Sequence, residues 1–216
     1  MIKLSPSLLA ADFNQLGNEI KKIYDNGADM IHLDVMDGIF VPNTSFGVPV
    51  LESLRKNTSI VFDTHLMITD PIRYIDDFAR VGSDIITFHY EACFDQMAVI
   101  QKIKDNGKLA GMSIKPGTDP RVLDKYMDVL DLILIMSVEP GFGGQKFMPM
   151  ALEKLRYCRQ KIQESGRDIM LEVDGGITLD NAKQVVESGA DVLVAGSSVF
   201  RAQDTVSAIR GFKELS

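Results

Sequence analysis

Acidic and imidazole side chains alternate with apolar residues in three segments of the chain. Alternate residues of a β-strand point to the same face, so each pair of polar groups would share one face. Mixed imidazole and carboxylate ligands suit a divalent cation such as Zn²⁺, Fe²⁺, Co²⁺ or Mn²⁺, and carboxylates can also transfer protons. The pairs, in chain order, are His32 with Asp34, Asp63 with His65, and Glu172 with Asp174.

The three histidines of the chain, His32, His65 and His89, each fall at or near the end of an apolar segment. One such histidine is more often a hydrogen-bonded core residue than a ligand, whereas three at the same end of successive segments favour a site. Two nearby acids have simpler interpretations. Asp37 and Asp63 fit a role as loop or helix caps, and Asp63 also fits a residue that orients a liganding histidine.

Glycine-rich segments form a second group of candidate functional residues. They are "EPGFGGQKF" from Glu139 to Phe147, "DGGIT" from Asp174 to Thr178, and "AGSSVF" from Ala195 to Phe200. Consecutive glycines let backbone N–H groups approach an anion, and a short helix that begins at Gly196-Ser197 would add its N-terminal dipole. Together with the acids and histidines, these segments predict a phosphorylated small-molecule substrate.

A recurring pattern of helix, glycine and apolar run indicates how these groups are positioned. "DNGAD", "VGSD", "DNGKL", "SGRD" and "SGAD" each place a glycine where a helix would end, and a short apolar run follows. Short, nearly all-apolar runs are typical of parallel strands buried on both faces. The candidate strands lie at residues 3–9, 30–35, 59–67, 84–90, 109–114, 130–138, 169–174 and 192–196.

Eight strand–helix units in this length favour a closed (β/α)8 barrel, with an open doubly wound parallel sheet as the alternative. No linker or change of composition divides the chain, so we expect a single barrel domain over residues 1–216. In such a barrel the active site lies at the carboxyl ends of the strands, and the loops after the seventh and eighth strands commonly bind phosphate.

Composition excludes several classes of protein. The net charge is −7 and no long basic run occurs, which argues against a nucleic-acid-binding protein. Only two cysteines are present, without C-x-x-C spacing, so we expect neither a disulfide framework nor a thiolate zinc site, and we expect a cytoplasmic protein. The N-terminus does not resemble a signal peptide, and no stretch of about 18 apolar residues could span a membrane.

Six segments together resemble the ribulose-phosphate 3-epimerase family, in order and along nearly the whole chain. The resemblance implies a (β/α)8 barrel that interconverts D-ribulose 5-phosphate and D-xylulose 5-phosphate, a step of the pentose phosphate pathway. The proton at C3 would move between two acids, through an enediolate. The matching segments are "SPSLLAADF", "HLDVMDGIFVPNTSFG", "DTHLMI", "MSVEPGFGGQKF", "EVDGGI" and "VAGSSVF".

The resemblance also assigns roles to individual residues. It implies that Asp34 and Asp174 transfer the proton, and that these two acids bind one divalent cation per subunit together with His32 and His65. The methionines that would cover the reacting centre are Met36, Met67 and Met136. The implied substrate contacts are Ser7, His65, Gly141, Phe142, Gly143, Gly144, Asp174, Gly175, Gly176, Gly196 and Ser197.

The sequence departs from the family pattern at Glu139 and Lys115, where many relatives have Asn. These positions leave open a D-allulose 6-phosphate 3-epimerase, which acts on a phosphorylated hexulose by the same mechanism. A non-catalytic phosphosugar-binding barrel is disfavoured because both acids are present, and a decarboxylase is disfavoured because no Lys lies beside Asp34 or His65. The resemblance implies a homo-oligomer, a dimer or a hexamer, and leaves the metal unspecified.

Overall fold

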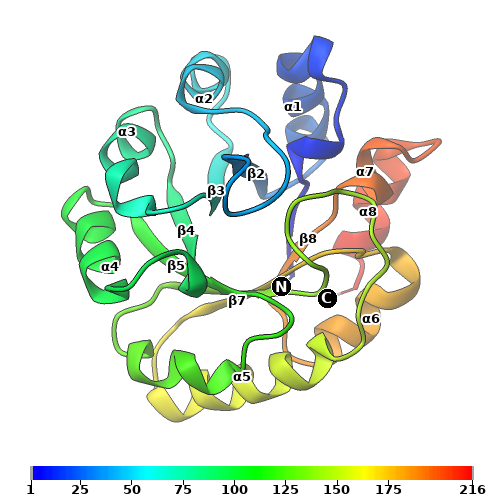
Figure 1. Cartoon of the computed structure of the whole chain (residues 1–216). Coiled ribbons are helices and arrows are strands. Elements are labelled where there is room, and N and C mark those ends of the chain that lie inside the picture. The colour runs from blue at the N-terminus through cyan, green and yellow to red at the C-terminus, as the bar shows by residue number, and fades with distance from the viewer. Residues whose placement is uncertain (1, 216) are drawn as a thin grey trace.

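Eight parallel strands form the centre of the molecule in the computed structural model, which describes residues 2–215. Around the sheet their order is β1-β8-β7-β6-β5-β4-β3-β2 (Figure 1). Their bounds are β1 Lys3–Ser5, β2 Met30–Met36, β3 Val61–Met67, β4 Ile85–His89, β5 Leu109–Ile114, β6 Leu132–Met136, β7 Met170–Asp174 and β8 Val192–Val194.

The ring closes between β1 and β2. A parallel bridge pairs Ser7 with His32, and the His32 backbone N–H donates to the Pro6 carbonyl at 3.0 Å. An open sheet would leave these two edges apart. The prediction of a (β/α)8 barrel is therefore confirmed, and the open doubly wound sheet is wrong.

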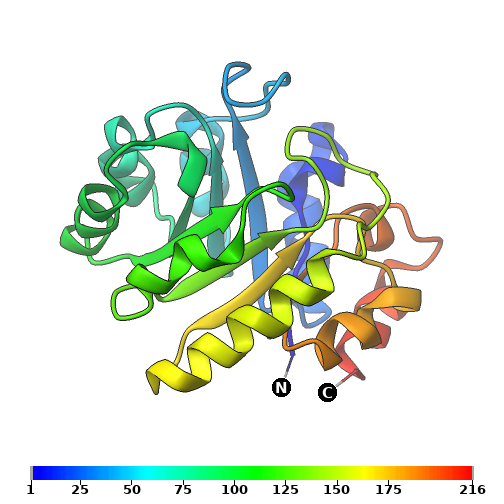
Figure 2. The same cartoon turned by 60° about the horizontal axis from the view of Figure 1, so that its bottom comes forward.

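Helices surround the ring, as Figures 1 and 2 show. Apolar side chains of both layers form the core between strands and helices, because the strands are covered on both faces. The helices are α1 Leu16–Asp25, α2 Val48–Arg55, α3 Ile75–Arg80, α4 Gln96–Asp105, α5 Ala151–Ser165, α6 Leu179–Glu187, α7 Ser197–Phe200 and α8 Thr205–Lys213. The short 3-10 turns are η1 Leu8–Ala10, η2 Phe13–Gln15, η3 Pro71–Arg73, η4 Tyr90–Ala92 and η5 Pro120–Tyr126.

The glycines of the recurring pattern all have positive φ, as expected for residues that end a helix. Their φ values are 95° at Gly27, 101° at Gly82, 69° at Gly107, 68° at Gly166 and 110° at Gly189. A residue with a β-carbon rarely adopts this conformation. Glycine therefore sets the point at which each helix turns back into the next strand.

The strand that carries His32 and Asp34 is longer than the sequence pattern indicates. It continues through Met36, which pairs with Met67 at the end of β3. Asp34 therefore lies two residues before the end of β2, and His32 lies near its middle. Only His89 is the last residue of its strand.

Two expectations from composition can be compared with the structure. Cys93 is half-buried and Cys158 is buried, and both are free thiols, so the absence of a disulfide between them is confirmed. Across residues 2–215, no helix has both the length and the apolar character that a membrane crossing requires.

Candidate active site

A cavity of about 330 Å³ opens at the carboxyl ends of the strands. It brings together the two acids, the three methionines and the glycine-rich loops. Of the predicted site residues, it is lined by Ser7, Asp34, Met36, Met67, Met136, Gly141, Phe142, Gly143, Gly144, Asp174, Gly175, Gly176, Gly196 and Ser197. His32 and His65 do not line it, because both are fully buried.

Strand register places the imidazoles against the acids. In the pairing of β2 with β3, His32 lies opposite Asp63 and Asp34 lies opposite His65. Asp174 reaches the same point from the end of β7. We call His32, Asp34, His65 and Asp174 the acid–imidazole cluster. Each of its members offers one ligand atom, and these atoms all lie within 4.8 Å of one another.

The distances in this cluster fit a small divalent cation. His32 Nε2 lies 3.3 Å from His65 Nδ1 and 3.4 Å from Asp34 Oδ1, and His65 Nδ1 lies 3.3 Å from Asp34 Oδ1. Four tetrahedral ligands with bonds of about 2.0–2.1 Å to zinc have neighbouring atoms roughly 3.3–3.4 Å apart. The cluster is therefore able to hold a metal ion, with two imidazole nitrogens and carboxylate oxygens as donors.

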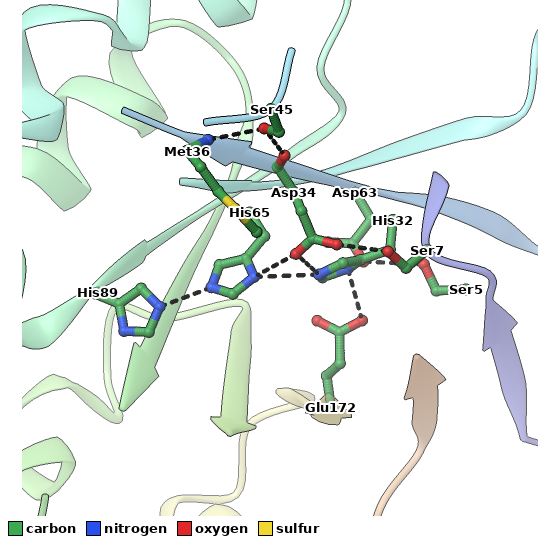
Figure 3. A network of polar contacts seen from close by, with 10 residues as sticks. All are labelled: Ser5, Ser7, His32, Asp34, Met36, Ser45, Asp63, His65, His89 and Glu172. Carbon is green, nitrogen blue, oxygen red and sulfur yellow. Dashed lines mark hydrogen bonds and ion pairs between the residues drawn. The ribbon is translucent and has the colours of Figure 1, made fainter. Parts of the chain in front are cut away.

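Asp63 orients His32 (Figure 3). Its Oδ2 lies 2.6 Å from His32 Nδ1 and also accepts a hydrogen bond from the Ser5 hydroxyl at 3.0 Å. Because a carboxylate oxygen accepts, His32 Nδ1 carries the hydrogen, and Nε2 is the atom that faces the cluster. Asp63 is thus a partner of a histidine rather than a loop cap.

The two acids that line the cavity have opposite tendencies. Burial alone would oppose ionisation of Asp34, but the charge and hydrogen bond of His32 outweigh it, and the pKa of Asp34 is lowered. Burial and the negative charge of Asp34 raise the pKa of Asp174 to about 7. Near neutral pH, in the absence of a cation, Asp34 is an anion and Asp174 retains much of its proton. Acid and base roles are divided between two carboxyl groups in this manner in many active sites.

The two oxygens of Asp34 face different partners. Oδ1 faces the imidazoles of His32 and His65, whereas Oδ2 accepts a hydrogen bond from the Ser7 hydroxyl at 2.5 Å (Figure 3). Ser7 and Asp34 both line the cavity. One oxygen is therefore available to a cation while the other is directed toward a bound molecule.

Two further acids lie outside this division. Glu172 is fully buried below the cluster, and burial together with the charge of Asp63 raises its pKa well above the ordinary range, so it is a neutral acid. Asp37 caps the loop after β2, because its carboxylate accepts hydrogen bonds from the backbone N–H groups of Ile39, Phe40 and Thr69. The loop-cap interpretation of Asp37 is confirmed.

We call residues 141–144, 175–176 and 196–197 the glycine loops. They lie side by side because their parent strands β6, β7 and β8 are neighbours in the sheet. A β-carbon on Gly176 would lie 2.4 Å from the Phe147 backbone nitrogen, and φ there is 63°, so only glycine fits. As predicted, a short helix begins at Ser197, directly after Gly196.

The sequence analysis did not include several residues that the structure places near the site. Lys146, Thr178 and Asn181 also line the cavity. Their signal in the sequence was proximity to the glycine motifs, which does not show where a side chain points. Conversely, Lys115 and Glu139 are not among the cavity-lining residues, and the Lys115 ammonium lies 3.9 Å from the centre of the Phe40 ring.

Comparisons with known proteins agree with this geometry. A family model described as the ribulose-phosphate 3 epimerase family matches residues 3–200. The ribulose-phosphate 3-epimerase of Bacillus subtilis is 48% identical over 99% of this chain and 100% of its own length. The enzyme of the same name from Escherichia coli is 48% identical over 93% of this chain and 90% of its own length.

More distant solved structures share the fold alone. Phosphoribosyl anthranilate isomerase from Thermotoga maritima superposes with a TM-score of 0.71 at 13% identity, covering 100% of this chain and 98% of that one. A 3-hexulose-6-phosphate synthase from Salmonella typhimurium gives a TM-score of 0.69 at 17% identity, covering 99% of this chain and 98% of that one. At such low identity the likeness supports the barrel and says nothing of the chemistry.

Proposed function

The chain belongs to the ribulose-phosphate 3-epimerase family, and from that premise we propose that it interconverts D-ribulose 5-phosphate and D-xylulose 5-phosphate by a two-base transfer of the C3 proton between Asp34 and Asp174. The observation that carries the proposal is the pair of carboxyl groups that line one cavity, one with a lowered pKa and one with a raised pKa.

Epimerisation beside a carbonyl removes a proton from one face of a carbon and returns a proton to the other face. One fixed base cannot easily serve both faces. Asp34 on β2 and Asp174 on β7 lie three strands apart around the ring, so a substrate between them would be flanked on both sides. In one direction the Asp34 carboxylate removes the proton and Asp174 protonates the enediolate, and in the reverse direction the roles exchange.

The other side chains of the cavity would support this transfer. When bound to the acid–imidazole cluster, a divalent cation would offset the negative charge that develops beside C3. Ser7 holds the base in position through its hydrogen bond to Asp34 Oδ2. Met36, Met67 and Met136 form an apolar cover that would exclude water from the reacting carbon. A direct contact between His65 and the substrate stays a prediction, since His65 is fully buried.

The glycine loops would hold the phosphate of the substrate through backbone N–H groups. Lys146 lines the same cavity and would add a positive charge. The cluster and the loops share one cavity, which matches a small sugar that carries a phosphate at one end and reacts near the other. We also propose a single-domain, cytoplasmic homo-oligomer with one divalent cation per subunit.

A coupled assay with D-ribulose 5-phosphate and D-allulose 6-phosphate tests the proposal, with metal analysis of the same sample. We expect faster turnover of the pentulose, and deuterium from heavy water at C3 of the product. Inversion without solvent label would contradict proton transfer through exchangeable acids. Preference for the hexulose would replace the substrate and leave the mechanism standing.

A further inference from the structure

We propose that His89 and Glu91 are positioning residues, which fix the tautomer of His65 so that its Nδ1 lone pair faces the acid–imidazole cluster. The inference rests on the proposed function only in taking the cluster as the metal site. Neither residue lines the cavity, and the reaction described above uses neither of them.

The contacts form a chain from the rim of the barrel to its centre. His65 Nε2 lies 2.9 Å from His89 Nε2 (Figure 3), and His89 Nδ1 lies 3.2 Å from Glu91 Oε2. Both imidazoles are fully buried. The side chains come from β3, from the end of β4 and from η4, the turn that follows it.

Only one arrangement of hydrogens satisfies this chain. A carboxylate accepts, so His89 Nδ1 carries a hydrogen and donates it to Glu91. A neutral His89 then has a lone pair on Nε2, which must accept from His65 Nε2–H. A neutral His65 with its hydrogen on Nε2 has its lone pair on Nδ1, the atom 3.3 Å from both His32 Nε2 and Asp34 Oδ1. The reverse order would place the bare Nδ1 of His89 against a carboxylate oxygen.

The carboxylate that sets the direction is itself fixed. Glu91 Oε1 accepts from the Lys115 backbone N–H at 2.8 Å and from the Thr118 hydroxyl, which leaves Oε2 for His89. Burial opposes the charge of Glu91, but its bonds to His89, Thr118 and Lys115 lower its pKa to about 2. Burial lowers the pKa of His89 to about 4 against the pull of Glu91, so the pair consists of a carboxylate and a neutral imidazole.

The arrangement parallels the way in which Asp63 holds His32. Asp63 accepts directly from His32 Nδ1, whereas Glu91 acts on His65 through the second imidazole. The ring of Phe40 packs against His89 at 4.8 Å between ring centres and helps to hold the imidazole plane. Both candidate imidazole ligands therefore have the nitrogen that is remote from the cluster tied to an acceptor, as ligating histidines usually do.

Histidine side-chain ¹⁵N NMR of the metal-free wild type tests the direction of the chain, and only three histidines need assignment. We expect hydrogen on Nε2 of His65 and on Nδ1 of His89. The spectrum needs no variant that might alter folding, and hydrogen on Nδ1 of His65 in the wild type would overturn the proposal.

The variant Glu91→Gln tests the effect of the carboxylate. Its amide oxygen should still accept from the Lys115 backbone N–H and Thr118, which directs the NH₂ group at His89 and reverses both tautomers. His65 Nδ1 would then carry a hydrogen, and Zn²⁺ affinity, measured by competition with a chromophoric chelator, should fall about 10- to 100-fold. Thr118→Val is the matched control, because it removes a bond to the same carboxylate on the opposite oxygen, and its affinity should stay within about threefold of the wild type.

Unchanged tautomers and unchanged Zn²⁺ affinity in Glu91→Gln would contradict the inference, as would an equal loss in Thr118→Val, which would indicate general loosening. These measurements use no substrate. A protein with the expected tautomers and no epimerase activity would refute the proposed function alone. An active epimerase with the reversed tautomers would refute only the role of His89 and Glu91.

Discussion

The acid–imidazole cluster and the glycine loops lie in one cavity but are built from different parts of the chain. The cluster uses side chains on β2, β3 and β7, and strand register sets their mutual distances. The glycine loops use backbone, and the absence of side chains leaves its N–H groups accessible. The first region is defined by chemical groups and the second by shape.

This difference determines how each region should respond to change. An isosteric substitution in the cluster alters charge or proton affinity and leaves packing intact, so it should affect turnover. A substitution in the glycine loops adds volume and leaves charge unaltered, so it should affect substrate binding. The predictions below test this division, beginning with the largest expected effect.

Removal of the metal should abolish activity. Strong chelation should reduce turnover below detection, and adding Zn²⁺, Co²⁺, Mn²⁺ or Fe²⁺ should restore it, because the two imidazoles and two carboxylates of the cluster would lose their common ion. His65→Ala should lose both metal and turnover, as measured by elemental analysis and the coupled assay. Full activity in thoroughly demetallated protein would show that the cluster has no catalytic metal.

Asp34→Asn and Asp174→Asn should each lower kcat by about 10²–10⁴-fold, the range that a positioned acid or base supplies. KM should change little, because the glycine loops stay intact. Metal-loaded Asp174→Asn should still exchange the substrate proton with heavy water through Asp34, without inverting C3. Epimerisation by that variant at the wild-type rate would show that two bases are not required.

In the glycine loops, Gly196→Val should raise KM about tenfold or more and alter kcat far less. A β-carbon there would lie 3.3 Å from that of Ala10 and 3.5 Å from that of Ser7, which is tight without a backbone collision. Gly176 is a poorer test, because its β-carbon would strike backbone and the loop itself would move. Gly17→Ala on α1, with open space around it, is the control. Unchanged KM in Gly196→Val would remove the phosphate assignment from this loop.

A pH dependence of stability should belong to the cluster alone. Folding raises the pKa of Asp174 to about 7, so the native state retains a proton that the unfolded chain releases near pH 4. This contribution is fully present below pH 4 and is lost as the pH rises to 7. In metal-free protein, the free energy of unfolding of the wild type relative to Asp174→Asn should fall by about 2–4 kcal/mol over that range. Denaturant titrations of both proteins measure it, and parallel curves would contradict the assignment.

The barrel and the composition of the cluster were predictable from sequence. Buried parallel strands have nearly continuous apolar runs, glycines mark the helix ends, and alternation shows which polar residues share a face. His32 and Asp34 were assigned to one face in this way, and the structure places them within 3.4 Å of each other.

Other features depend on contacts that no local pattern encodes. Glu91 is fixed by the backbone of Lys115 and by Thr118, both more than 20 residues away along the chain. The extension of β2 to Met36 depends on pairing with β3. The neutral state of Glu172 depends on its depth in the barrel and on Asp63, so the sequence alone showed only an acid that shares a face with Asp174.

The smallest effect is expected at Lys115, one of the two positions that depart from the family pattern. Its ammonium lies over the Phe40 ring and outside the cavity, so Lys115→Asn would remove a cation–π contact of about 0.5–1 kcal/mol and no substrate contact. Its backbone N–H, which bonds Glu91, would be retained. The ratio of kcat/KM for the pentulose and hexulose phosphates should therefore change by less than about threefold. A change of tenfold or more would mean that the substrate extends beyond the cluster and the glycine loops toward β5. The division of the site into two regions would then need a third, which selects the length of the sugar.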